Sequence, residues 1–178
     1  VFIGNGQQLV TSTLVTNMVA LPSSSDPARM TVGLRSASGV QELPESIVSG
    51  GALGGILNFR SEFLDRTTND LGRIAASLAL TFNAQHALGQ DLNGNILGDV
   101  AFVADFFTLS TPRVVSNSLN PAGSPVLGMA YTPPEYNGNF YTNLTNSDYR
   151  LQYNGTDFTL TRLSDNRAWT GLANIAAV

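Results

Sequence analysis

Several polar side chains in the sequence have the types and spacing that a metal site needs. Asp91, Asn93 and Asn95 occupy the first, third and fifth positions of a calcium-binding loop. The sixth position of such a loop is a glycine and the twelfth a glutamate, but here they are Ile96 and Phe102. The ligand set is incomplete, so the segment is interpreted as a polar turn.

A second candidate is the glycine-rich segment 50–55, GGALGG, which resembles a phosphate-binding loop. A P-loop requires a lysine after its glycines, and the sequence has none, because all 9 basic residues are arginines. A dinucleotide-binding loop requires a buried strand before the glycines, and Pro44 interrupts that strand. The segment is interpreted as the flexible start of a helix.

Groups for acid–base or nucleophilic chemistry are few. His86 is the only histidine and cysteine is absent, which argues against a zinc site or a serine triad. The acidic pairs Glu42/Glu45 and Glu62/Asp65 fit the usual pattern of solvated charges better than that of glycosidase carboxylates. The sequence therefore predicts a protein that is not an enzyme, with no catalytic residues, no cofactor and no metal.

Composition narrows the possible partners. The 178 residues include 43% apolar and only 12% charged residues, with a net charge of −4. An acidic chain without basic clusters is a poor nucleic-acid binder, because neutralising phosphates supplies most of that affinity. No apolar run is long enough to insert into a membrane.

The elements are organised around a predicted helix over residues 51–88. It is expected to be N-capped by Ser49, to end at a left-handed Gly89 and to bend near residues 64–69. Its large apolar residues recur in steps of three, four and seven, which places them along one helix face. This face is the predicted assembly interface, and its members are Leu57, Leu64, Leu71, Ile74, Leu78 and Phe82. Gly54, Gly55 and Gly72 are expected to be points of close packing.

Antiparallel β structure is predicted on both sides of the helix. Asn5-Gly6 predicts a hairpin that sets Phe2 opposite Leu9. Asn154-Gly155 predicts a second one, with Leu151 opposite Phe158. Residues 100–109 are apolar and fit either a short helix or a buried strand, whereas residues 117–146 are rich in turn residues and read as a surface loop.

The fold class is therefore α+β, a long central helix flanked by small antiparallel β parts. Three parts are expected: a small β part over residues 1–48, the helix over 49–90, and an outer β domain over 91–178.

At the level of specific residues, the segment from Leu43 to Asn95 resembles the flagellar hook-associated protein 1 family, the hook–filament junction proteins. The resemblance extends outward to Asn5-Gly6-Gln7, to Asp26-Pro27-Ala28-Arg29 and to the segment 148–163. Its most specific cluster is Phe82-Asn83 with Gln85-His86, and the other matches include Gly54-Gly55, Phe59-Arg60, Leu64-Asp65 and Leu71-Gly72.

The resemblance implies a structural component of the bacterial flagellum. It implies export without a cleaved signal peptide, an extracellular location, and a ring of copies between the hook protein and a second junction protein or flagellin. It also implies that the chain is a central fragment lacking the family's terminal helices. The alternative is a secreted carbohydrate-binding β module, based on Tyr131, Tyr136, Tyr141 and the asparagine-rich loop.

Overall fold

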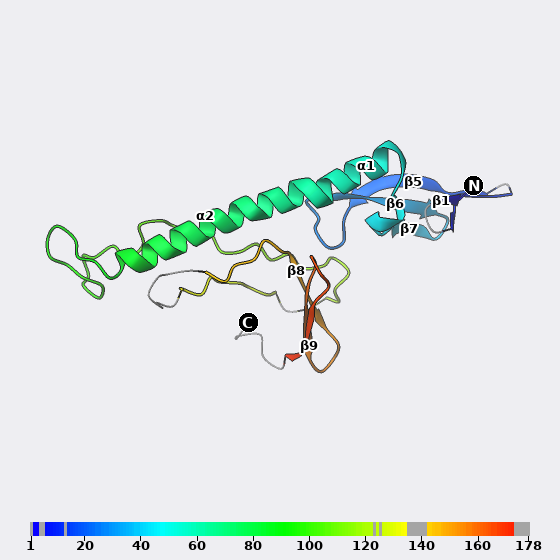
Figure 1. The fold of residues 1–178 in the computed structure, drawn as a ribbon. Coiled ribbons are helices and arrows are strands. Elements are labelled where there is room, and N and C mark those ends of the chain that lie inside the picture. Colours follow the sequence, from blue (N-terminus) through cyan, green and yellow to red (C-terminus); the bar gives the residue numbers. More distant parts are fainter. Residues whose placement is uncertain are drawn as a thin grey trace. The chain divides into compact units, whose positions relative to one another are not determined.

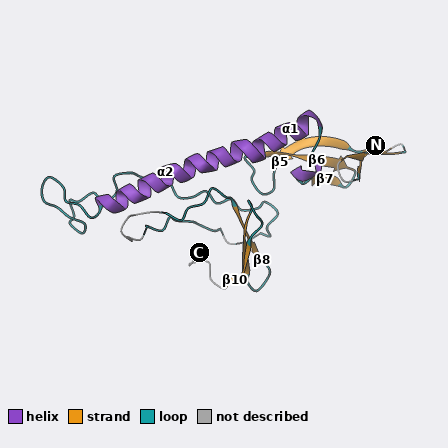
Figure 2. Cartoon of the chain, viewed as in Figure 1, coloured by secondary structure: helices purple, strands orange, loops and turns teal. Residues whose placement is uncertain are grey.

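The computed structural model describes residues 2–3, 6–12, 14–122, 124, 126–134 and 142–172. It contains one long helix and two three-stranded antiparallel sheets, which confirms the predicted α+β class (Figures 1 and 2). Contacts divide the chain into two compact units. The first comprises residues 1–64 and 110–132, and the second comprises residues 65–109 and 133–178. The first part of the helix therefore belongs to one unit and the remainder to the other.

The first unit contains two short hairpins and a sheet. The strands of the hairpins are β1 (Phe2–Ile3), β2 (Gln7–Gln8), β3 (Val10–Thr11) and β4 (Leu14–Val15). Phe2 pairs with Gln8 rather than with Leu9, so the predicted register was wrong by one residue. Three residues separate β1 from β2, and Gly6 has a φ of 99°, which suits a three-residue hairpin loop with glycine in the left-handed region.

The sheet of this unit has the order β5-β6-β7, with β5 at Asn17–Pro22, β6 at Met30–Ser36 and β7 at Gly39–Glu42. The turn before β6 is the predicted one: Arg29 N donates to Asp26 O and Ala28 N to Asp26 Oδ1. A short 3-10 turn, η1 (Glu45–Ile47), follows β7. The buried apolar side chains of the unit are Leu34, Leu43, Val48 and Leu57.

Residues 51–86 are helical without interruption, as α1 (Gly51–Phe59), a π-helical turn η2 (Arg60–Leu64) and α2 (Asp65–His86). Gly50 is the N-cap residue and no side chain caps the helix, so the expected cap by Ser49 was wrong. At the C-terminal end Gly89 N donates to His86 O, but Gly89 does not take the left-handed φ expected of it. The irregularity expected near residues 64–69 lies slightly earlier, at the π turn.

Only one of the three helix glycines makes the close contact expected of it. A Cβ on Gly54 would lie 2.7 Å from the carbonyl carbon of Ser49, so the chain entering the helix packs tightly there. Gly55 and Gly72 have no neighbouring atom within 4 Å of such a Cβ. For these two positions the packing prediction was wrong.

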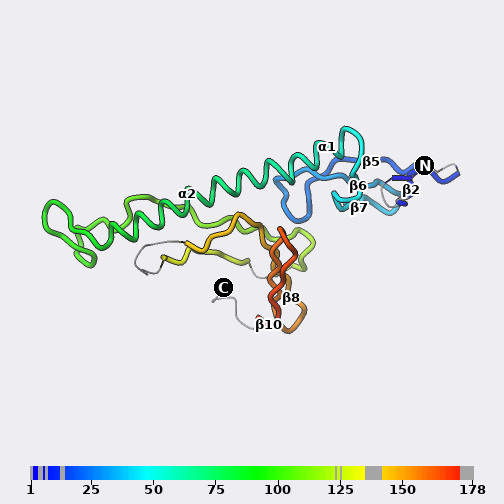
Figure 3. Tube along the Cα trace, viewed as in Figure 1, coloured from blue at the N-terminus to red at the C-terminus, as the bar shows by residue number. Residues whose placement is uncertain are grey.

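In the second unit the chain leaves α2 and turns back along it (Figure 3). Residues 100–109 form neither the helix nor the strand that the sequence allowed. Phe82 contacts the rings of Phe106 and Phe107, each at a centroid distance of 5.2 Å. This segment is held by side-chain contacts with the helix rather than by regular hydrogen bonding.

The second sheet has the order β8-β9-β10, with β8 at Tyr149–Tyr153, β9 at Phe158–Arg162 and β10 at Ala168–Leu172. The predicted β8–β9 hairpin is present, but Leu151 pairs with Leu160, so the register differs by two residues. The physical reason is the side chain of Asn154, whose Oδ1 accepts hydrogen bonds from the backbone N–H groups of Thr156 and Asp157. These bonds stabilise a four-residue connection. On β10 the pairing shifts between Trp169 and Leu172, and Gly171 has a φ of 70° there.

Candidate assembly surface on the helix

The large apolar side chains of α2 are exposed. Leu71, Ile74 and Leu78 follow one another in steps of three and four, and their exposed fractions are 68%, 57% and 59%. Phe82, one turn further, is 43% exposed although it contacts two rings of the returning chain. Exposed leucine and isoleucine side chains in such a row favour burial against another apolar surface.

The opposite side of α2 is covered by its own unit. Ala76 and Ala79 are 5% and 7% exposed. Small side chains let the returning segment approach the helix closely, and two longer residues fasten it. Asn83 exchanges two hydrogen bonds with the backbone of Phe107, and His86 Nδ1 lies 3.1 Å from Ala104 O. The helix therefore has one satisfied face and one apolar face without a partner among the described residues.

His86 is a packed polar residue, as the sequence indicated. Its ring stacks on Phe102 with a centroid distance of 5.3 Å and an interplanar angle of 16°. Its Nδ1 is directed at the carbonyl of Ala104. The only histidine thus holds the returning segment in place.

Along α1 the apolar residues divide between two sides. Leu57 is 7% exposed and belongs to the buried set of the first unit, so it is not available to another molecule. Ile56, Phe59 and Phe63 are exposed, and the rings of Phe59 and Phe63 stack at 5.8 Å. The sequence prediction omitted Phe59 and Phe63, although two phenylalanines four residues apart on a predicted helix were a signal for such a pair.

We use the term apolar stripe for the exposed large apolar residues of the helix. Its members are Ile56, Phe59, Phe63, Leu64, Leu71, Ile74, Leu78 and Phe82. Five of the six residues predicted from the sequence belong to this set, and Leu57 does not. Whether the stripe is an assembly interface stays a prediction.

Arg60, at the start of the π turn, fastens the helix to the strands of its unit. Its Nη1 donates to Met30 O at 2.9 Å, and its Nη2 forms an ion pair with Glu45. Its Nε is buried and has no hydrogen-bond partner among the described residues. The first-unit end of the helix is therefore held by a charged side chain as well as by apolar contacts.

The candidate calcium loop is a turn held by one carboxylate. Asp91 Oδ1 accepts hydrogen bonds from Asn93 N and Asn95 N, and Asp91 Oδ2 accepts one from Asn95 Nδ2. The hydrogen bonds from Asn95, first from its side chain, lower the pKa of Asp91. Within the described part of the chain, no three histidine or acidic residues come together in a way that could hold a metal ion.

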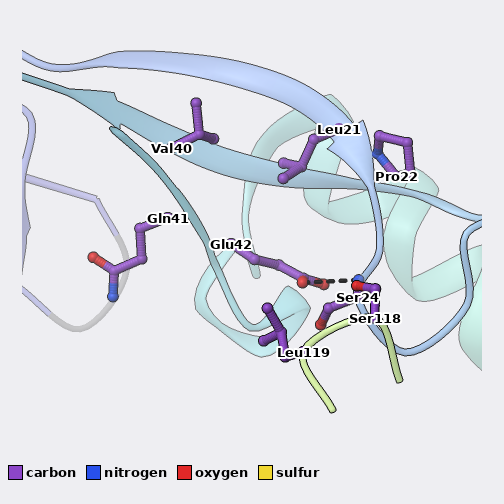
Figure 4. A pocket seen from close by; sticks show the side chains of 8 residues that line it. All are labelled: Leu21, Pro22, Ser24, Val40, Gln41, Glu42, Ser118 and Leu119. Atoms are coloured by element: carbon purple, nitrogen blue, oxygen red, sulfur yellow. Dashed lines mark hydrogen bonds between the residues drawn. The ribbon is translucent and has the colours of Figure 1, made fainter. Parts of the chain in front are cut away.

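Glu42, one of the acidic residues considered for hydrolysis, lines a shallow groove of about 450 Å³ beside β7 (Figure 4). Its two carboxylate oxygens accept hydrogen bonds from Ser23 Oγ and Ser24 N. Hydrogen bonding by Ser24, and further by Ser23, lowers the pKa of Glu42. Glu45 is engaged separately with Arg60, so these two carboxylates are not a pair facing a shared substrate site.

Comparison with known proteins decides the family. Residues 1–102 match the family model described as the flagellar hook-associated protein FlgK helical domain. The chain belongs to the FlgK family. Residues 136–176 also match a model described as the flagellar hook-associated protein 1, D2-like domain.

Individual FlgK relatives agree with this assignment. Flagellar hook-associated protein 1 of Salmonella typhimurium is 38% identical over 169 residues, and that of Escherichia coli K12 is 36% identical. Each alignment covers 94% of this chain but 28% of the relative, so the chain spans less than a third of the length of these proteins.

A solved structure shows the same fold. The flagellar hook junction protein FlgK from Burkholderia pseudomallei superposes with a TM-score of 0.80 at 35% identity, covering 96% of this chain and 30% of that one. The family membership does not favour the carbohydrate-binding alternative. Tyr136 and Tyr141, on which that alternative partly depends, lie outside the described residues.

Among the described residues of this FlgK-family chain, no helix combines the length and the apolar content needed to cross a membrane.

Proposed function

We propose that this chain is part of a structural component of the bacterial flagellum that joins the hook to the filament. The protein works outside the cell, after export without a cleaved signal peptide. Its partners are other copies of itself in a ring, with the hook protein on one side and a second junction protein or flagellin on the other. It carries out no reaction and uses no cofactor.

The observation that carries this proposal is the apolar stripe. The second unit covers the alanine side of α2 and leaves Leu71, Ile74 and Leu78 more than half exposed. Burying apolar surface contributes about 25 cal/mol per Å². Helix-face packing between neighbouring copies would bury these side chains, and this burial supplies the cohesion of the ring.

Family membership supports the setting. The relatives are named flagellar hook-associated protein 1, and the related solved structure is described as a flagellar hook junction protein. A junction between two stiff assemblies needs extended contact surfaces more than it needs a catalytic pocket. An exposed row of large side chains along a helix is such a surface.

The test is a charge placed on the stripe in the full-length protein. Leu71→Asp and Leu78→Asp should each give cells that release flagellin into the medium and spread poorly in soft agar. Arg66→Asp is the matched control, because it adds an aspartate at an exposed helix position outside the stripe. Attached filaments and normal swimming in both leucine variants would contradict the proposal.

A further inference from the structure

The π turn at Arg60–Leu64 lies between the two parts of the apolar stripe. Ile56 and Phe59 precede or begin it, and Leu71, Ile74 and Leu78 follow it. A π turn accommodates one more residue than an α turn, and such turns are frequent at functional sites. Its position raises the question of what the extra residue does to the direction of the side chains beyond it.

An uninterrupted α-helix turns by about 100° per residue. In such a helix, Leu78 would point roughly 100° around the axis from Phe59, and Ile74 about 60° away. The extra residue of the π turn delays every later side chain by about 100°. Leu78 then comes into line with Phe59, and Leu71 and Ile74 fall within about 40° on either side.

Burial of individual residues agrees with this change of direction. With the same delay, Ala76 points about 160° away from Phe59, as Leu57 does. Both side chains are buried, with exposed fractions of 5% and 7%. The exposed and the buried residues therefore each form one row along the helix, which they would not do without the extra residue.

We infer that the π turn sets the phase of the helix, so that its two apolar segments form one straight stripe for a single long helix of a second copy of the protein. This inference rests on the proposed function and names the geometry of its contact. Thr67 and Gln85, the polar residues that share the line, are uncharged, so no charge interrupts the stripe.

The area of the stripe suits a second copy. A stable interface takes roughly 800 Å² from each partner. Large apolar side chains at about half exposure offer on the order of 100 Å² each, so the members of the stripe together approach that area. Without the π turn, a straight partner helix would cover only one of the two segments.

The test compares one-residue changes in the full-length protein. Deleting Glu62, which is exposed, removes the extra residue and converts the π turn to α while preserving the phase beyond it. This variant should keep filament attachment and swimming within about twofold of wild type. Inserting an alanine after Glu62 rotates the later segment by about 100° and should release most flagellin into the medium. Circular dichroism of both purified variants should show an unchanged helix content.

The partner is tested by a photoreactive benzoylphenylalanine at Thr67 in assembled flagella. A cross-linked product of twice the subunit mass supports a second copy. A product confined to one subunit, or one with another protein, overturns that assignment.

The two hypotheses fail in different ways. If Leu71→Asp blocks assembly but both length variants assemble normally, the stripe is an interface and the phase-setting role is wrong. The role is also wrong if the deletion is as damaging as the insertion while the helix content is intact. If Leu71→Asp and Leu78→Asp are harmless, the proposed function itself fails.

Discussion

Asn83 and Phe107 hydrogen-bond to each other twice. Asn83 Nδ2 donates to Phe107 O at 2.8 Å, and Phe107 N donates to Asn83 Oδ1 at 2.9 Å. A side-chain amide thus satisfies both backbone groups of one residue in a segment that lacks regular secondary structure. Phe107 is placed against Phe82 by this contact, so one polar residue positions the aromatic cluster at the end of α2.

Replacing Asn83 by alanine should detach this segment. The change removes both hydrogen bonds and should lower the free energy of unfolding by about 1–2 kcal/mol. Hydrogen exchange of the Phe107 amide should accelerate at least tenfold, whereas Asn58→Ala, an exposed asparagine in α1, should leave it unchanged. Equal protection of Phe107 in wild type and Asn83→Ala would show that the contact does not hold the segment.

Arg60 should be replaceable by neither lysine nor alanine. A lysine carries one ammonium group in place of the guanidinium fork, so it cannot reach both Met30 O and Glu45 in the same way. We expect Arg60→Ala to cost about 2–3 kcal/mol in chemical denaturation and Arg60→Lys to recover only part of that loss. Arg66→Ala, at an exposed helix position, should stay within about 0.5 kcal/mol of wild type.

Two glycine-to-alanine changes should have opposite effects. A Cβ on Gly33, in the middle of β6, would lie 2.7 Å from Leu21 Cδ2 and 2.8 Å from Gln41 O, so Gly33→Ala should destabilise by about 1–3 kcal/mol. Gly72 lies in α2 with no atom within 4 Å of an added Cβ. Gly72→Ala should therefore stabilise by about 0.5–1 kcal/mol. Thermal unfolding of the pair gives the sign directly, and a stabilised Gly33→Ala would refute the steric reading.

The Arg162–Asp165 pair should make stability depend on acid pH. The hydrogen bond from the Arg162 side chain, and then that from Arg167 N, lower the pKa of Asp165 to about 2 from a usual value of 3.8. Because the folded-state pKa is the lower one, the stabilisation is fully present above about pH 4 and disappears as the pH falls through about 2. The Tm difference between wild type and Asp165→Asn should shrink over that range.

Carbon-13 NMR of the Asp165 carboxyl group checks the same contact independently. The midpoint of its titration should lie near 2 in wild type and move towards 3.8 in Arg162→Gln, because the variant lacks the largest cause of the shift. A midpoint that is the same in both proteins would exclude the ion pair as the cause.

The elements themselves could be predicted because their signals are local. Apolar steps of three and four identified the helix, and Asn154-Gly155 identified the second hairpin. The register of that hairpin could not be read from the dipeptide, since it depends on which backbone groups the Asn154 side chain caps. The apolar run at residues 100–109 gave no element, because its phenylalanines are held by tertiary contacts with the helix.

The candidate surface shows the limit of periodicity more clearly. Leu57, Leu64, Leu71 and Leu78 are spaced by seven residues, which predicts one row. The π turn between Leu57 and Leu71 breaks that row, so Leu57 is buried whereas Leu71 is exposed. Nothing in residue spacing announces a π turn. The contact of Arg60 with Glu45 was equally out of reach, because it depends on how the chain between them folds back.

The irregular pairing of β10 has a consequence for solubility. A regular outer strand offers a ladder of unpaired backbone groups on which sheets of other molecules can grow into aggregates. The break between Trp169 and Leu172, with its left-handed Gly171, interrupts that ladder after a few residues. A protein that gathers at high local concentration while a filament grows is thereby protected against sticking through the wrong edge.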